Sequence, residues 1–166
     1  MSAPFTISRL LKAPRQLVWD VYSQPAHLAH WLGPKGSRVT HSQMDFREGG
    51  TYHYAMTVEG GMELWGKWLL REITPPERIV LIQHFSDAQG GLTRNPWSPV
   101  WPLQTLSTTT LTDQGNNATL LHLEWSAFEA TAEETAAFDA AHASMNQGWS
   151  GNFDVLDDYL SLLQTP

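Results

Sequence analysis

Cysteine is absent from this sequence of 166 residues. Disulfides, thiolate nucleophiles and cysteine-bound metals are therefore excluded. The sequence also has no apolar run near the eighteen residues that predict a membrane-spanning helix. Its first fifteen residues lack the apolar core and the cleavage site of a signal peptide. We therefore expect a cytoplasmic protein without membrane spans.

Positive charge is missing from the C-terminal part of the chain. The last of the ten lysines and arginines is Arg94, whereas residues 95–166 carry only carboxylates, and the net charge is −7. Such a surface repels phosphate backbones, which argues against a nucleic-acid partner. It fits either a solvated helix face that keeps the protein in solution or an acidic docking face for a basic partner.

Charged residues are few overall, and aromatic residues are many. Charged residues make up 16% of the chain, while hydrophobic ones make up 42% and include eight tryptophans. This composition is typical of a compact protein with a large core rather than of a disordered one. A chain of this length is expected to form one domain, residues 1–166, that buries about two-thirds of its unfolded surface.

The segment 131–163 contains no proline and is rich in alanine. Its large apolar residues recur at steps of mostly three and four: Phe138, Met145, Trp149, Phe153, Leu156, Leu160 and Leu163. This spacing forms one stripe of an amphipathic helix. We therefore predict a single C-terminal helix, roughly 45–50 Å long at 1.5 Å per residue.

Most of the chain before this segment is predicted to be strands joined by tight turns. Alternating, β-branched runs bounded by Gly, Pro and Asn predict strands over 5–11, 38–46, 51–58, 62–73, 78–85, 103–111 and 118–126. Pro14 and Pro25 open two short helices after the first strand, over 15–22 and 26–31. The order predicts an α+β fold, in which a curved antiparallel sheet wraps around the long C-terminal helix.

Six motifs in this order resemble one superfamily over nearly the whole chain. They are Ala13-Pro14 with Val18-Trp19, Trp31 with Gly33-Pro34 and Gly36, Met44 to Gly50, Gly66, Pro75 to Val80, and Gly148-Trp149. The sequence resembles the helix-grip proteins, also called START-like, birch-pollen-allergen-like or SRPBCC proteins. Within them it looks most like homologues of the activator of the ninety-kilodalton heat-shock protein ATPase.

The resemblance implies a single START-like domain with an apolar cavity between the sheet and the C-terminal helix. Such a cavity takes a lipid-like or polycyclic small molecule, and the family has no shared catalytic set. Two features differ from the family. The 90–102 segment is longer and richer in tryptophan and proline, and the extra N-terminal domain of the eukaryotic co-chaperone is absent from this sequence.

Three functions follow as hypotheses. The first is binding of a hydrophobic small molecule in the cavity, with no chemistry and no cofactor. The second is a protein-interaction or co-chaperone-like module that uses the acidic helix face and the 90–102 segment. The third is a cyclase or hydratase, which would need a buried polar pair with shifted pKa values at the cavity floor. A homodimer is a further alternative that the sequence leaves open.

We predict that the ligand site is lined by aromatic residues and methionines from the sheet and the helix stripe. These candidates are Met44, Tyr52, Tyr54, Met56, Trp68, Trp97, Trp101, Phe138, His142, Met145, Asn146, Trp149 and Phe153. Tyr54, His142 and Asn146 are the expected polar contacts, and Asn152 is a further polar candidate near the same level. For Trp97 and Trp101, a lid, a dimer interface and simple surface cover all remain open.

Several polar and glycine positions have a structural interpretation. His27 and His30 lie three apart on a short helix, but no third ligand accompanies them, so no metal site is predicted. Asp45 and Arg47 are expected to form an ion pair beside the turn that follows. Gly148 and Gly151 each cost about 1 kcal/mol in a helix, which predicts close approach of a strand or a ligand.

Overall fold

The computed structural model describes residues 3–166, which form eight strands and four helices. The strands are β1 (Phe5–Leu11), β2 (Arg38–Met44), β3 (Thr51–Thr57), β4 (Glu63–Thr74), β5 (Arg78–Ser86), β6 (Leu92–Thr93), β7 (Gln104–Gly115) and β8 (Ala118–Phe128). The helices are α1 (Arg15–Ser23), α2 (Pro25–Trp31), α3 (Ala132–Ala140) and α4 (His142–Leu163). This order confirms the predicted α+β class.

The strands form one antiparallel sheet in the order β1-β8-β7-β5-β4-β3-β2. Consecutive strands from β2 to β8 are neighbours except for β6, a two-residue strand that pairs with β5 alone. β1 returns to pair with β8. The register slips between Val39 and His41 and between Leu70 and Glu72. Slips of this kind bend a strand, and they help to curl the sheet into a half-cylinder.

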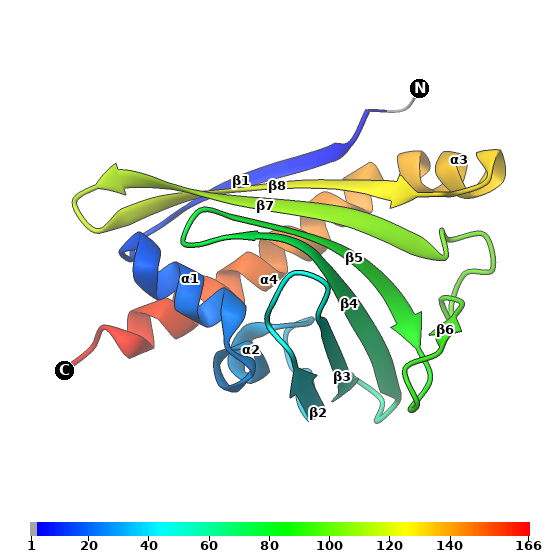
Figure 1. The fold of residues 1–166 in the computed structure, drawn as a ribbon, viewed down its shortest axis with the longest axis horizontal. Helices are drawn as coiled ribbons and strands as arrows, with labels where there is room; N and C mark the ends of the chain where they lie inside the picture. Colours follow the sequence, from blue (N-terminus) through cyan, green and yellow to red (C-terminus); the bar gives the residue numbers. More distant parts are fainter. Residues whose placement is uncertain (1–2) are drawn as a thin grey trace.

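Helix α4 runs across the concave side of this sheet, as Figure 1 shows. The two short helices α1 and α2 lie beside its C-terminal half, and α3 lies at the other end next to β8. Pro14 caps α1 and Pro25 occupies the first turn of α2, so both helices begin where the sequence predicts. This arrangement is the predicted helix grip.

The prediction of one unbroken helix over 131–163 is wrong. The helix is interrupted at Ala141, whose ψ of 2° leaves the helical range, so α3 and α4 are separate. Thr131 and Glu134 form a capping box at the start of α3, because each side chain bonds the other's backbone N–H. Phe138 packs against Trp101 and Trp125. These contacts hold α3 at the sheet end while α4 takes its own direction.

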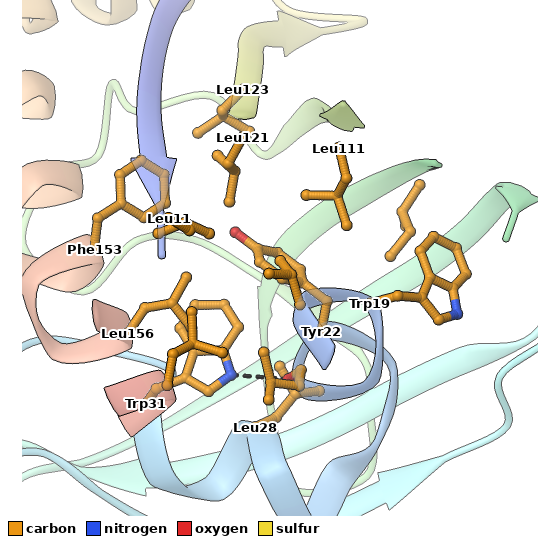
Figure 2. Packing of buried hydrophobic residues seen from close by; sticks show 14 of the residues in the cluster. Leu11, Trp19, Tyr22, Leu28, Trp31, Leu111, Leu121, Leu123, Phe153 and Leu156 are labelled. Carbon is orange, nitrogen blue, oxygen red and sulfur yellow. Dashed lines mark hydrogen bonds between the residues drawn. The ribbon is translucent and has the colours of Figure 1, made fainter. Parts of the chain in front are cut away.

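The largest apolar cluster lies between the sheet and the helices α1, α2 and α4 (Figure 2). Side chains from β1, β7, β8, α1, α2 and α4 meet there, including Leu11, Tyr22, Leu111, Leu121 and Phe153. The indole N–H of Trp31 donates a buried hydrogen bond of 2.8 Å to the Val21 carbonyl. We use the name packed end for the part of this cluster formed by Leu11, Val18, Trp19, Leu111, Leu121, Leu123, Phe153 and Leu156.

No strand closely approaches Gly148 or Gly151 within residues 3–166, so this part of the prediction is wrong. Among the residues that the structure describes, none would place a heavy atom within 4 Å of a Cβ built at either position, apart from the chain neighbours and the backbone of the same helix. Gly148 is exposed. Neither glycine is therefore needed for packing, because the stripe of α4 that faces the sheet runs through Asn152, Phe153, Leu156 and Leu160 instead.

Candidate ligand-binding cavity

A cavity of about 570 Å³ lies between the concave face of the sheet and the helices. Its wall takes residues from α1, α2, β3, β4, β5, β7, β8 and α4, and from the loops after α2, β3 and β6. Lys35, Glu59 and Trp97 line it and are exposed, so they mark its rim. Volumes of this size are typical of small-molecule sites.

Aromatic rings form the wall on β3 and β4. Tyr54 and Trp68 line the cavity, with ring centroids 6.2 Å apart. Behind them lies Tyr52, which is fully buried and stacks on Tyr54 at 5.0 Å. Because three large rings pack against each other, this part of the wall presents a broad, rigid apolar surface to the cavity.

Gly66 allows Tyr54 to lie across the sheet. The two residues are cross-strand partners, and a Cβ at Gly66 would come within 2.5 Å of the Tyr54 hydroxyl and 2.6 Å of its Cζ atom. Only a residue without a side chain leaves room for the ring. The ring then extends over β4 toward β5, where its hydroxyl accepts a hydrogen bond of 3.2 Å from Gln83 Nε2.

The Tyr54 hydroxyl is neutral and keeps its own proton. Burial raises the pKa of Tyr54 to about 12, although the hydrogen bond from Gln83 acts in the opposite direction. Since Gln83 is the donor in that bond, the Tyr54 O–H is free to donate to another oxygen. The site therefore offers a neutral hydrogen-bond donor within an apolar wall.

The floor on β7 carries small hydroxyl residues. Thr105, Ser107 and Thr109 alternate along the buried face of the strand, and all three line the cavity. Their partners across β5 are Gln83, Leu81 and Ile79. A strand face next to a core usually carries large apolar residues, so these smaller side chains help to leave the space unfilled.

The segment between β6 and β7 closes one side of the cavity. Trp97 is 61% exposed at the rim, whereas Trp101 packs against Trp125 and Phe138. Arg94 ties this segment to α3, because its Nη1 lies 2.7 Å from Glu134 Oε2 and bonds the carbonyls of Pro99 and Trp101. The backbone N–H of Thr131, and then Arg94, lower the pKa of Glu134 to about 2.

Six of the thirteen candidate ligand residues lie on the wall of this cavity. They are Tyr54, Met56, Trp68, Trp97, Trp101 and Trp149. The structure brings them together from β3, β4, α4 and the segment between β6 and β7. Tyr54 is the one expected polar contact among them, and Asn152 of α4 joins it on the wall.

The other seven candidates lie elsewhere. Tyr52 and Phe153 are fully buried in the main apolar cluster, and Met44 packs at its edge. Phe138 and Met145 belong to a second cluster with Phe5. Because the helix breaks at Ala141, His142 turns toward the rings of Phe5 and Phe138 instead of the cavity, and Asn146 is exposed.

Sequence reasoning missed Gln83, Trp125 and the three hydroxyl residues of β7. All of them line the cavity. The alternation Thr105, Ser107, Thr109, Leu111 was a usable signal, because hydroxyls at every second position of a central strand must face either solvent or a polar cavity. The position of Gln83 could not be recognised without the strand register that places it beside Tyr54.

The other polar candidates have structural roles. His27 Nδ1 lies 2.6 Å from the hydroxyl of Tyr159, and the ring of His30 stacks on the same tyrosine. Asp45 and Arg47 form an exposed ion pair of 2.8 Å. Within residues 3–166, no three His, Asp or Glu side chains are grouped to hold a metal ion. None of the helices in this range has the length and hydropathy needed to cross a membrane.

Solved structures with the same architecture define the class. The structure aligns with a solution structure of a protein from Arthrobacter aurescens at a TM-score of 0.78 and 26% identity, over 96% of this chain and 86% of that one. A crystal structure from Mycobacterium smegmatis gives a TM-score of 0.74 at 22% identity, over 96% and 91%. The AHSA1 protein from Silicibacter pomeroyi gives 0.72 at 17%, over 98% and 100%. The fold is that of the helix-grip, START-like proteins.

The family follows from the sequence match. Residues 12–161 match the family described as activator of Hsp90 ATPase homolog 1-like protein. The chain belongs to this family, as the motifs in its sequence indicated. Comparison with curated proteins gives no match.

Proposed function

We propose that this protein binds an apolar small molecule in the cavity between the sheet and α4. The observation that carries the proposal is a cavity of about 570 Å³ walled by aromatic and aliphatic side chains. Burying apolar surface there contributes on the order of 25 cal/mol per Å². A molecule that covers 200 Å² of the wall thus gains about 5 kcal/mol before the cost of association is subtracted.

The composition of the wall supports binding rather than incomplete packing. Tyr54, Trp68 and Trp125 come from three different strands and all line the same space. Aromatic residues supply a large apolar contact area and keep little conformational freedom once packed. The polar groups are few, as is usual in sites that fix the orientation of a largely apolar ligand.

Titration with pyrene tests this proposal. Pyrene is uncharged and polycyclic, and it accepts excitation energy from nearby tryptophans. The proposal predicts saturable loss of tryptophan emission at one pyrene per chain, with matching sensitised pyrene emission. Absence of saturable transfer, or continued uptake beyond one equivalent, would contradict it.

Two matched variants locate the bound molecule. Ser107→Phe adds a ring to the cavity floor, whereas Thr108→Phe adds the same ring to the opposite face of β7, because neighbouring residues of a strand alternate. The proposal predicts that Ser107→Phe abolishes saturable binding and that Thr108→Phe retains it. Circular dichroism checks that both variants are folded. Equal binding by both would place pyrene outside the cavity.

A further inference from the structure

The hydroxyl groups on the cavity floor indicate the chemistry of the ligand. Ser107 and Thr109 are only 7% and 6% exposed, and both line the cavity. Within residues 3–166, neither hydroxyl has a hydrogen-bond partner, and neither is sealed away from open space. Buried hydroxyls are nearly always paired with protein, water or a ligand. Both therefore remain available to a molecule in the cavity.

Their spacing is set by the strand. Residues two apart on one face of a strand are separated by about 7 Å, since each residue advances the chain by about 3.3 Å. Ser107 and Thr109 have this relation, and their flanking partners on β5 and β8 are apolar: Leu81, Ile79, Trp125 and Leu123. The floor thus presents two polar points on a straight line with apolar surface on both sides.

The cavity wall also disfavours a charged ligand. Among the lining residues, the fully charged side chains are Lys35 and Glu59, and both are exposed at the rim. A carboxylate or sulfonate held at Ser107 or Thr109 would lose its hydration without gaining a cation. A neutral hydroxyl or carbonyl oxygen loses much less and can form a hydrogen bond with either residue.

One more neutral donor lies on the wall. In the hydrogen bond between Gln83 and Tyr54, Gln83 Nε2 is the donor, so the Tyr54 O–H is free to donate to another oxygen. Like the hydroxyls of Ser107 and Thr109, it favours a ligand with acceptor oxygens.

We propose that the ligand is an uncharged, rigid ring system with two oxygen substituents on one edge, about 7 Å apart, received by Ser107 and Thr109. This inference rests on the proposed function, because it names the class of molecule that the same cavity takes. A fatty acid does not fit it, since its carboxylate would need a cation inside the cavity and its chain has no second oxygen.

Isomers of dihydroxynaphthalene test the spacing. In the 2,7-isomer the two hydroxyls lie on one edge at about the strand spacing, whereas in the 2,3-isomer they are adjacent. Displacement of pyrene measures both affinities. We expect the 2,7-isomer to bind about 10-fold more tightly, as one or two additional hydrogen bonds give. Naphthalene-2,7-disulfonate, which carries charges at the same positions, is expected not to displace pyrene.

Conservative variants assign the effect to the two residues. In the double variant with Ser107→Ala and Thr109→Val, the preference for the 2,7-isomer should fall to within about 2-fold. The control carries Thr108→Val and Thr110→Val on the opposite face of β7 and should keep the full preference. Pyrene itself should bind all three proteins, because it has no polar substituents.

Other results would contradict either the two-oxygen ligand alone or binding in the cavity as well. Equal affinity of the two isomers, or an unchanged preference in the double variant, would overturn the inference while leaving the cavity as an apolar site. Pyrene binding that none of the naphthalenes displaces would overturn it too. Failure of the wild-type protein to bind pyrene would overturn the proposed function and this inference together.

Discussion

The packed end and the cavity occupy the same layer between the sheet and the helices, yet one is filled and the other is hollow. Strand β7 runs through both. Its buried face carries Leu111 at the packed end and Thr109, Ser107 and Thr105 along the cavity. On β8, Leu121 and Leu123 lie at the packed end, and Trp125 lies on the cavity wall. The hollow is thus encoded by side-chain size and polarity on a continuous backbone.

A fold shared by many proteins can acquire a site when the side chains at one end of it change. The packed end holds the helices on the sheet with large aliphatic and aromatic side chains (Figure 2). The cavity end places rings side by side at the wall and small hydroxyls at the floor. Because the packed end stabilises the fold, the cavity end is free to change its chemistry, and the two ends should respond differently to mutation.

The largest expected effect is the difference in stability loss between two Leu→Ala variants on neighbouring strands. Leu111→Ala at the packed end should reduce the free energy of unfolding by about 4 kcal/mol, whereas Leu81→Ala on the cavity wall should cost about 2 kcal/mol. Leu81 already has open space on one side and so loses fewer contacts. Urea unfolding of both variants measures the difference. Equal losses would mean that the cavity is packed as densely as the core.

The next effect concerns a glycine that the wall requires. Gly66→Ala should destabilise the protein by about 1–3 kcal/mol, because the new methyl group forces the Tyr54 ring away from β4. Pyrene binding should weaken as well, since that ring is part of the wall. Urea unfolding and pyrene titration measure the two changes. If the variant is as stable as the wild type, Tyr54 does not lie across Gly66.

Substitution of a second glycine should have the opposite effect on stability. Gly148→Ala in α4 should stabilise the protein by up to about 1 kcal/mol, because alanine favours the helix and its methyl group meets open space. The melting temperature, measured beside that of Gly66→Ala, tests this. Loss of stability would indicate that Gly148 is in a close contact after all.

The smallest effect concerns the segment that closes the cavity. The pKa of Glu134 is lowered to about 2 from an ordinary value of 4.5. A carboxylate with a lowered folded-state pKa stabilises the fold above its unfolded pKa, and this contribution disappears as the pH falls toward 2. Arg94→Ala should raise the pKa of Glu134, which a carbon-13 NMR titration of the side chain would detect. A wild-type value near 4.5 would disprove the Arg94 contact.

Much of the fold could be predicted from the sequence because its signals are local. Alternation, prolines and turn glycines predicted the strand and helix order, and family motifs predicted the grip of sheet on helix. The break at Ala141 could not be predicted, since alanine is an excellent helix former. It depends on contacts of α3 with distant residues, including that of Glu134 with Arg94.

The site was harder to predict because a cavity depends on register and rotamers. Tyr54 on β3 and Trp68 on β4 line the cavity, as the alternation along these strands indicates, whereas Tyr52 shares the face of Tyr54 but is fully buried behind it. Phe138 falls outside it because α3 takes its own direction before the break at Ala141, and His142, the first residue of α4, lies against the rings of Phe5 and Phe138. Gln83 could not be recognised as a wall residue from the sequence, because this depends on the β4–β5 register that places it opposite Trp68.

The most direct test of the central claim compares the indole N–H signals of the eight tryptophans before and after pyrene is added. Trp68 and Trp125 lie on the cavity wall, whereas Trp19 lies at the packed end and does not line the cavity. We predict that the nitrogen-15 correlated signals of Trp68 and Trp125 shift and saturate at one equivalent while that of Trp19 stays in place. Equal shifts of all three, or a shift confined to the exposed Trp97, would contradict an internal binding site.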